Sequence, residues 1–455
     1  MELKRSYRSA VEGIAFPAFP QQQGGALLAT LWQLEQSQWW PAEQLQNQQQ
    51  EQLLVLLNHA MQTVPYYQQC LSAAGYRPGQ SWDQALWSAL PILKRHNVQE
   101  MQAQLHSQRL PAGHGKPFLV QSSGSTGRPV QVLGSDMTRF YWDISTLRDN
   151  HWQRHDFMQK FAAVRPDRGA KGHERAMCKG WGTPVDYIYQ SVPSLIINSR
   201  VDVRQQLQWL QEYQPVYLLS LPSNLRELLR LSEQEAIKLS ALQQVRCYGE
   251  TVPPRLRETV RKVWNVGLTD IYSSTEIGYM ALQCPDHEHY HVQSETMYLE
   301  VLDDNDQPCQ PGQIGRVVVT PLHNFAMPLI RYEVGDYAEV GEACACGRGL
   351  PVLTRIVGRT RNMVRTPEGK CYWPSFPIAE LLEVASIRQL QLQQVALDSI
   401  EVSVVMQGQL TAEQEKRLQQ RLHASLNYPF HLRFNCVDSI EVQKNGKFED
   451  FISLL

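Results

Sequence analysis

The sequence predicts an α/β protein with more than one domain. The chain has 455 residues, which is too long for a single compact core. From about residue 118 onward, short apolar runs alternate with amphipathic segments, as expected for layers of strands and helices. After about residue 358 the pattern changes to a small α+β unit of normal domain size. We therefore expect a large α/β domain followed by a small α+β domain.

The N-terminal part is expected to be helical. Residues 26–62 carry apolar side chains at helical spacing, interrupted at Pro41. The glutamine-rich stretch 44–52 resembles a low-complexity segment, but leucines follow it in phase, which favours the solvated face of a helix. Further helices are expected at 201–213, 225–236, 254–264 and 411–426, and strands at 116–121, 130–134, 215–222, 242–249, 268–274, 296–304, 312–322, 329–342, 399–408 and 432–443.

Composition and charge exclude several classes of protein. The formal net charge is -2, which gives no electrostatic footprint for nucleic acid or for an anionic membrane. The basic N-terminus is not followed by an apolar run, and the sequence contains no apolar run of transmembrane length, so we expect neither a signal peptide nor a membrane span. Nine cysteines, an odd number, argue against a secreted disulfide framework. We therefore expect a cytoplasmic protein.

A loop rich in glycine and hydroxyl groups joins the first two expected strands. It lacks the spacing of a Walker-type loop, so that kind of nucleotide site is not supported. Its glycines allow close backbone approach, while its hydroxyls and one cation suit a triphosphate. A plain hairpin turn is an equally good interpretation of these residues alone. The loop consists of Ser122, Ser123, Gly124, Ser125, Thr126, Gly127 and Arg128.

Four later segments carry residues suited to a nucleotide, although each has an ordinary structural alternative. At the end of an expected strand, Tyr272 can cover a purine, Thr275 can donate to a phosphate, and Glu276 can hold Mg²⁺. Asp336 in RYEVGD can accept hydrogen bonds from a ribose, although an aspartate in a hairpin is common. The other two are Arg359 in VGR and Lys447 in NGK.

Six motifs in order carry a family resemblance. They are SSGSTGRP (122–129), YGE (248–250), YSSTEIG (272–278), RYEVGD (331–336), VGR (357–359) and NGK (445–447). With these motifs, the chain resembles the adenylate-forming (acyl- and aryl-CoA synthetase) superfamily. It is most similar to the phenylacetate–CoA ligase-like branch, which includes relatives connected with capsular polysaccharide biosynthesis. The resemblance extends from about residue 50 to the C-terminus.

The resemblance implies a two-step reaction. Members use ATP and Mg²⁺ to turn a small carboxylic acid into an acyl-adenylate and pyrophosphate, and a nucleophile, often CoA, then displaces AMP. It implies an N-terminal adenylation domain (1–357) and a mobile α+β lid domain (358–455). By position, the 122–128 loop would hold the β- and γ-phosphates, Thr275 would touch the α-phosphate and Glu276 would bind Mg²⁺. The adenine would be enclosed by Tyr248, Gly249, Glu250 and Tyr272, and Asp336 would hold the ribose. Ser274 would lie in the nucleotide site, Arg359 would contact the nucleotide, and Lys447 would bridge the carboxylate and the α-phosphate.

Two departures from the family pattern leave the acyl acceptor open. Arg361 stands at the expected hinge, where members usually carry Asp or Lys. Residues 362–374 are more polar, and one residue longer, than the corresponding segment of CoA-forming relatives. The alternatives to CoA are an amine or a carrier-protein thiol. A non-catalytic adenylate-binding protein is an alternative of another class, but intact Glu276, Asp336 and Lys447 argue against it.

Cysteine and histidine residues gather in two segments, QCPDHEHYHV and ACACGRG. Three cysteines and one histidine can form a closed tetrahedral zinc site, which would be structural because no position stays open. The resemblance implies Cys284, Cys344 and Cys346 with His291, and His289 or His287 as alternatives to His291. Each cysteine alone would be an ordinary buried residue.

The acyl group is expected to bind beside aromatic side chains, although such residues are more often part of a core. Trp181, Tyr187, Tyr189 and Tyr248 are the candidates. The identity of the acid does not follow from the sequence, and a homodimer is allowed but not indicated.

Overall fold

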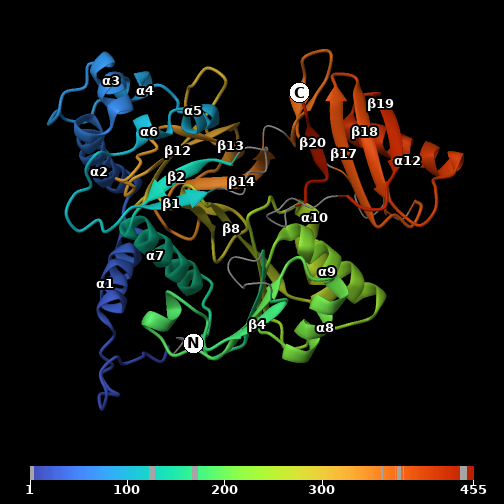
Figure 1. Ribbon diagram of the computed structural model, residues 1–455, viewed down its shortest axis with the longest axis horizontal. Helices are drawn as coiled ribbons and strands as arrows, with labels where there is room; N and C mark the ends of the chain where they lie inside the picture. The colour runs from blue at the N-terminus through green and yellow to red at the C-terminus, as the bar shows by residue number, and fades with distance from the viewer. Residues whose placement is uncertain are drawn as a thin grey trace. The chain divides into compact units, whose positions relative to one another are not determined.

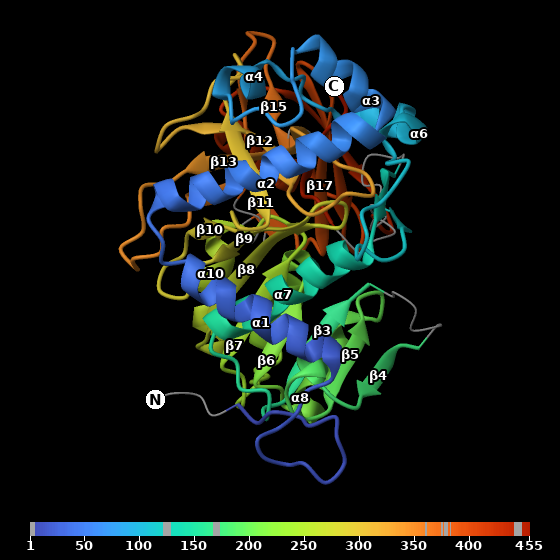
Figure 2. The same ribbon diagram turned by 90° about the vertical axis from the view of Figure 1, so that its left-hand side faces the viewer.

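The computed structural model describes residues 5–121, 129–166, 173–359, 362–374, 376, 381–382, 384–440 and 448–455. The chain forms two compact units (Figures 1 and 2). The first contains residues Met1–Val334 and Ala338–Ile356, and the second contains Gly335–Tyr337 and Val357–Leu455. No helix among the described residues is long and apolar enough to cross a membrane.

A twelve-stranded mixed sheet organises the large part of the molecule. Its order is β11-β12-β13-β14-β10-β9-β8-β7-β6-β3-β5-β4. Strands β5, β3, β6, β7 and β8 pair in parallel, whereas β9 pairs antiparallel with β8 and β10. The bounds are β3 Phe161–Arg165, β4 Arg175–Cys178, β5 Ser194–Asn198, β6 Tyr217–Ser220, β7 Gln244–Tyr248, β8 Gly267–Ser274, β9 Gly278–Gln283, β10 Tyr290–Val292, β11 Met297–Leu302, β12 Ile314–Pro321, β13 Tyr332–Val340 and β14 Val352–Arg359.

Helices cover both faces of the parallel half. In Figures 1 and 2, α1 and α7 run side by side on one face, and α8, α9 and α10 cover the other. A leucine-rich core joins α8–α10 to the parallel strands. The bounds are α1 Gln22–Ser37, α2 Ala42–Thr63, α3 Pro65–Ala73, α4 Gln84–Ala89, α5 Arg95–Glu100, α6 Gln102–Leu105, α7 Asp136–Trp152, α8 Val203–Tyr213, α9 Pro222–Gln234 and α10 Pro254–Trp264, with a 3₁₀ turn at Val185–Tyr187.

The expected pair of N-terminal helices is confirmed as α1 and α2, and so is the solvated face of the glutamine-rich stretch, where Gln44, Gln46 and Gln48 are exposed. Leu53, Leu56 and Leu57 of α2 are buried in the largest core, as their helical spacing requires. Gln49, by contrast, does not simply face solvent. Its amide nitrogen donates to the carbonyl oxygens of Ser294 (2.8 Å) and Met297 (2.9 Å). The face is therefore partly used to bind a loop of the sheet.

The second unit is built around a small four-stranded sheet. Its order is β19-β18-β17-β20, and β17 and β18 form its antiparallel centre. Helix α12 begins with a capping box of Thr411 and Gln414 and ends at Asn427 in the left-handed region. Its Leu418, Leu422 and Leu426 are buried in the core of this unit. The bounds are β15 Val364–Arg365, β16 Cys371–Tyr372, β17 Gln389–Ala396, β18 Ser399–Val405, α12 Ala412–Leu426, β19 His431–Cys436 and β20 Phe451–Ser453.

Candidate active site and cysteine–histidine cluster

The turn between β8 and β9 carries Thr275 and Glu276, at the place where the large sheet changes from parallel to antiparallel pairing. The hydroxyl oxygen of Ser274 accepts a hydrogen bond from the amide of Ile277 at 3.2 Å, which closes the turn. The side chain of Glu276 is 9% exposed, and its Oε1 lies 4.0 Å from Nη1 of Arg95. This turn therefore holds a carboxylate beside a cation at the edge of the sheet.

Tyr272 lies two residues before the end of β8. It pairs with Ala281 of β9, and the register shifts between Tyr272 and Ser273. Its side chain is 8% exposed and belongs to the largest hydrophobic core, together with Ile277 and Met280. The adenine contact expected of Tyr272 stays a prediction, and only a small part of the ring is available for it.

The loop after β7 is fixed to the neighbouring helix. Gly249 has φ +76°, which an L side chain rarely adopts. The Glu250 carboxylate accepts from both the amide (2.8 Å) and the hydroxyl (2.9 Å) of Ser223 in the first turn of α9. An anion is favoured there because the helix dipole is positive at its N-terminus. The hydroxyl of Tyr248 donates to the carbonyl of Val164 at 3.3 Å.

Asp336 and Arg359, two residues predicted to hold the nucleotide, lie together within the second unit. Nε of Arg359 is 3.3 Å from Oδ1 of Asp336, whose backbone follows Gly335 at φ +86°. The indole of Trp373 donates to the carbonyl of Arg359 at 3.1 Å and lies 4.7 Å from the ring of Tyr337. The structure therefore brings these two predicted residues together as an ion pair.

Three of the sequence predictions lie outside the described residues. They are the loop Ser122 to Arg128, the hinge residue Arg361 and the catalytic lysine Lys447. The strands that flank the loop, β1 Phe118–Gln121 and β2 Gln131–Gly134, pair antiparallel with Gln121 opposite Gln131. The two predicted strands are therefore confirmed, while the roles of these residues stay predictions.

The aromatic residues expected at the acyl pocket lie in two places. Tyr189 is buried, and Trp181 and Tyr187 pack against its cluster beneath α1 and α7. Trp181 also stacks on Phe161, with 4.8 Å between the ring centroids. Tyr248 packs against a second cluster on the parallel strands, which includes Phe161 and Tyr217, and Trp181 packs against that cluster as well. Much of this aromatic surface serves as core, as the alternative interpretation expected.

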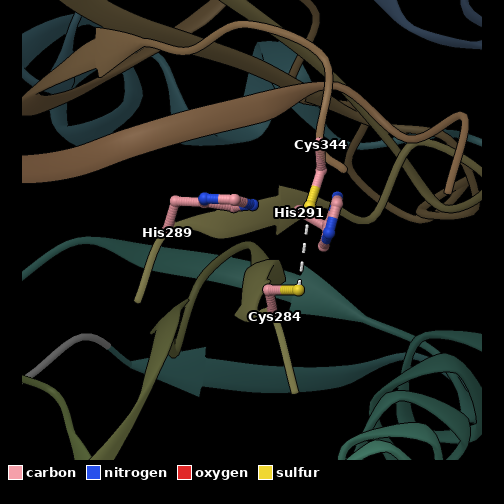
Figure 3. A group of neighbouring side chains, drawn as sticks. All are labelled: Cys284, His289, His291 and Cys344. Atoms are coloured by element: carbon pink, nitrogen blue, oxygen red, sulfur yellow. Dashed lines mark hydrogen bonds between the residues drawn. The ribbon is translucent and has the colours of Figure 1, made fainter. Parts of the chain in front are cut away.

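Cysteines and histidines from strand β10 and from the loops after β9 and β13 converge in the antiparallel half of the sheet (Figure 3). The ligand atoms of Cys284, His289, His291 and Cys344 all lie within 4.8 Å of one another. The sulfur atoms of Cys284 and Cys344 are 3.9 Å apart, and the sulfur of Cys346 is 3.4 Å from Nε2 of His291. A tetrahedral zinc ion bound at about 2.3 Å keeps two sulfur ligands about 3.8 Å apart. The donor set therefore fits such an ion, with His289 as a fifth candidate.

Burial disfavours the charged forms of these groups, the imidazolium and the thiolate. It lowers the pKa of His291 to about 4 and raises the pKa of Cys344 to about 12. Burial also disfavours the thiolate of Cys346, but hydrogen bonds from the backbone and side chain of Arg348 outweigh it and lower the pKa of that thiol. A neutral imidazole is the form that binds a metal, and a bound divalent cation deprotonates a thiol.

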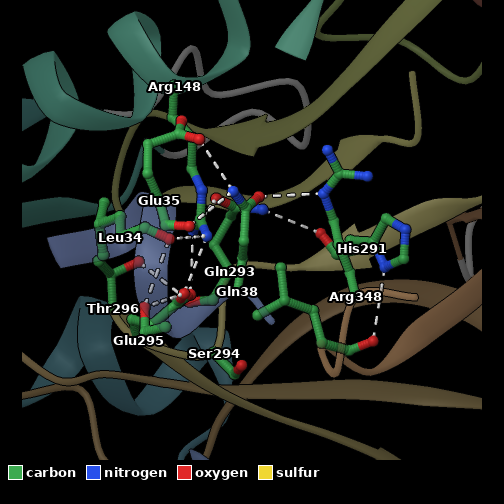
Figure 4. Close-up of polar contacts among 12 residues, drawn as sticks. Leu34, Glu35, Gln38, Arg148, His291, Gln293, Ser294, Glu295, Thr296 and Arg348 are labelled. Atoms are coloured by element: carbon green, nitrogen blue, oxygen red, sulfur yellow. Dashed lines mark hydrogen bonds and ion pairs between the residues drawn. The ribbon is translucent and has the colours of Figure 1, made fainter. Parts of the chain in front are cut away.

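Buried polar residues form a hydrogen-bonded network next to His291 of the cysteine–histidine cluster (Figure 4). The guanidinium of Arg148 donates to both oxygens of Glu295, each at 2.9 Å, and to Oε1 of Gln293 at 3.0 Å. The amide nitrogen of Gln293 donates to the carbonyl of His291 at 3.1 Å. Arg348 donates to Gln38 at 3.0 Å, so the end of α1 is tied to the same region. The network links α1, α7 and the cluster.

Comparisons with known proteins agree with this architecture. The family described as AMP-binding enzyme matches residues 191–326, and the family described as CapK C-terminal domain matches residues 367–453. The phenylacetate-coenzyme A ligase of Thermus thermophilus is 24% identical over 71% of this chain and 72% of its own length. The Escherichia coli protein of the same name is 22% identical over 83% and 86%.

Solved structures share the fold. A 2-hydroxyisobutyryl-CoA ligase in the postadenylation state aligns over 92% of this chain and 91% of its own, with a TM-score of 0.70 and 18% identity. An anthranilate CoA ligase aligns over 80% and 73%, with a TM-score of 0.54 and 15% identity. The two-part α/β fold is that of the CoA ligases of solved structure. The sequence is similar to adenylate-forming ligases, and among them to phenylacetate-coenzyme A ligases.

Sequence reasoning missed several partners of the predicted residues. Arg95 beside Glu276, and Ser223 beneath Glu250, lie far from their partners in the chain. The Arg148–Glu295 pair was missed as well, because a charged residue in an amphipathic helix ordinarily indicates an exposed face.

Proposed function

We propose that this chain activates a carboxylic acid with ATP as an acyl-adenylate and then transfers the acyl group to CoA. The observation that carries the proposal is the pair of loops after β7 and β8. These strands are neighbours and parallel, so Gly249–Glu250 and Thr275–Glu276 follow them at the same edge of the sheet. Ligands of α/β sheets bind at this carboxyl edge.

The roles within the site are part of the proposal. Attack of a carboxylate on an α-phosphate brings two anions together, so the site must position them and neutralise their charge. Mg²⁺ held by Glu276 and a cation from Lys447 would supply that field. Thr275 would hold the α-phosphate and Asp336 with Arg359 the ribose side of the nucleotide. The large domain would bind ATP and the acid, and the small domain would bring Lys447.

The test is acid-dependent exchange of labelled pyrophosphate into ATP, measured over a panel of aryl and acyl acids with Mg²⁺. We expect exchange with at least one acid, and a loss of about 100-fold or more in Glu276→Gln because a charge-stabilising group is removed. Glu258→Gln, which changes an exposed glutamate on α10, is the matched control. No exchange from folded protein with any acid would count decisively against the proposal.

Addition of CoA to the reaction tests the second step. We expect a thioester and AMP to form. Transfer of the acyl group from the adenylate to an amine or a carrier-protein thiol, with release of AMP and no reaction of CoA, would instead favour the alternative acceptor. A protein that binds a stable adenylate analogue but forms no adenylate would favour the non-catalytic alternative. A cytoplasmic location is also part of the proposal and rests on the composition of the chain.

The cysteine–histidine cluster is proposed to hold a structural zinc ion. Cys284, Cys344, Cys346 and His291 would be the ligands, with His289 able to replace one of them. Support comes from the sulfur–sulfur and sulfur–nitrogen distances and from the burial of the donors. Metal analysis of protein purified without chelators should give one zinc per chain, and Cys344→Ser should lower it. A content well below one equivalent would overturn the assignment.

A further inference from the structure

Asp143 on α7 is a buried carboxylate to which no partner is assigned. The residue is 8% exposed, and within the part of the chain that the structure describes no hydrogen bond or ion pair reaches its oxygens. The oxygens keep some contact with solvent-accessible space. The other described aspartates with so little exposure all have partners: Asp149 pairs with Arg246, Asp270 accepts from Tyr290, and Asp336 pairs with Arg359.

Arg139 acts electrostatically on Asp143 but forms no ion pair with it among the described contacts. Arg139 lies four residues earlier on the same helix, the spacing at which ion pairs form on a helix surface. Its guanidinium instead lies over the ring of Phe118, 4.5 Å from the centroid. Burial raises the pKa of Asp143 to about 6, and Arg139 offsets this only in part. At neutral pH the protein therefore keeps a mostly charged carboxylate in a confined place, which costs stability unless a ligand uses it.

The helix directs Asp143 toward the aromatic cluster beneath α1 and α7. Phe140 and Leu147, three residues before and four after Asp143, lie on the same helix face and belong to this cluster. Trp181 and Tyr187 pack in the same cluster. These are two of the aromatic residues expected beside the acyl group, and aromatic faces attract cations.

The segment that follows Trp181 and contains Tyr187 is held by its own contacts. Asp186 accepts a hydrogen bond from the amide of Gly182 at 2.9 Å and another from the hydroxyl of Ser191 at 2.5 Å. The carboxylate of Asp186 is therefore used within its own loop. Asp143, which has no such partner among the described residues, is available to a ligand.

The neighbouring face of α7 reaches toward the predicted activation centre. Trp142 and Tyr279 make an edge-to-face contact with 5.0 Å between ring centroids, and the hydroxyl groups of Thr146 and Tyr279 are 3.1 Å apart. Tyr279 is three residues after Glu276. Helix α7 thus lies between the turn that would bind Mg²⁺ and the aromatic cluster.

We propose that Asp143 recognises a protonated amine on the carboxylic acid substrate, so that the preferred substrates are amine-bearing acids. The inference rests on the proposed function. An ammonium group would complete the ion pair that Arg139 does not make, and the surrounding aromatic rings would favour the cation. A neutral acid of the same shape would leave the carboxylate buried and unpaired, which is an effective way to reject a wrong substrate.

The test uses pyrophosphate exchange with acids that differ in one group. The acids are 4-(aminomethyl)benzoate, 4-ethylbenzoate and 4-(hydroxymethyl)benzoate, their meta isomers, and the aliphatic pair 5-aminopentanoate and hexanoate. We expect the wild-type kcat/KM to favour an amine over its neutral counterpart by about 10-fold or more, the size of a buried charge-assisted contact. Asp143→Leu should reverse that preference, and Asp143→Asn should remove it. Asp136→Asn, an exposed aspartate on the same helix, should leave it unchanged.

Several results would overturn the proposal. Equal use of amine and neutral acids by the wild type would do so, as would a preference that survives in Asp143→Asn. If hydroxymethyl acids are preferred over amines, and Asp143→Leu removes that preference, then Asp143 recognises a neutral hydrogen-bond donor and the proposal of an amine is wrong.

A stability measurement separates recognition from a structural role. If Asp143 is kept for a ligand, Asp143→Asn and Asp143→Leu should raise the unfolding temperature of the ligand-free protein, because an unpaired buried charge is removed. A lower unfolding temperature in both variants would indicate a structural residue and overturn the proposal. If no acid supports exchange, the proposed function fails. Calorimetric binding of the same acids without ATP then tests Asp143 alone, and amines that bind no tighter than neutral acids would refute it.

Discussion

The parallel and antiparallel halves of the large sheet use polar residues in different ways. In the parallel half, Gly249–Glu250 and Thr275–Glu276 are predicted to bind the nucleotide, and they follow the ends of β7 and β8. In the antiparallel half, Cys284, His291 and the Arg148–Glu295 pair are enclosed between strands and helices. Groups at strand ends can receive and release a ligand, whereas enclosed groups are satisfied by each other. The comparison therefore assigns residues of the reaction to the strand ends of the parallel half, and residues that stabilise the fold to the antiparallel half.

Substitution of the predicted lysine should give the largest effect. Lys447→Ala is expected to lower the rate of adenylate formation by about 100-fold to 1,000-fold, since a transition-state cation is lost. Capture of a pre-made adenylate by the acceptor should be spared, because the lysine is not needed in that step. Both rates can be measured by quench flow. Lys416→Ala, an exposed lysine on α12, is the control. Loss of both rates would contradict a role limited to the first step.

Removal of the metal should affect stability more than chemistry. We expect a strong chelator to lower the unfolding temperature by roughly 5–10 °C, the equivalent of a few kcal/mol. The exchange rate per folded molecule should change little at 25 °C, because the cluster closes on itself. Calorimetry and exchange on the same sample provide both numbers. If the rate of pyrophosphate exchange falls in proportion to the metal content while the unfolding temperature stays constant, the cluster acts in the reaction and not in stability, and the assignment of roles to the two halves of the sheet is wrong.

The buried ion pair next to the cluster tests the same assignment without a metal. Arg148→Met should cost about 3–5 kcal/mol of unfolding free energy, because Glu295 is left charged and buried. Arg148→Met combined with Glu295→Met should cost much less, since neither charge remains. Urea unfolding of the single and double variants measures both. Additive losses would show that the two side chains do not act as a pair.

The smallest effect concerns pH. His155 is fully buried, with Nδ1 2.8 Å from Asn150 Oδ1 and Nε2 2.5 Å from Gln244 Oε1, and burial lowers its pKa to about 4. Between pH 6.5 and 4 this histidine is protonated in the unfolded chain but stays neutral in the folded protein, so the free energy of unfolding falls as the pH falls. The loss reaches about 2 kcal/mol at pH 5. Unfolding free energies at pH 7 and 5 should differ less in His155→Gln, and an unchanged difference would exclude this histidine as the source.

Local patterns predicted the N-terminal helices and most elements after residue 200, but not α7 or the strands β3, β4 and β5. The break at Pro41 separates α1 from α2, and the two strands around the glycine-rich loop form as expected. The glutamine-rich face is solvated as predicted, except at Gln49, because a glutamine that donates to a distant carbonyl cannot be told by sequence from one that faces water. Gln49 reaches backbone about 245 residues away in the sequence, and no local pattern reports such a contact.

The sequence by itself determined the fold class, the order of the motifs and the supply of cysteine, histidine and acidic side chains, because periodicity and residue chemistry are local properties. Only the tertiary structure decided which groups meet. It brings His289 as well as His291 to the cysteines, pairs Glu295 with Arg148, and leaves Asp143 without a partner among the described residues. The physical reason is that burial and pairing depend on segments far apart in the chain, and the cost of a buried charge is set by what lies beside it.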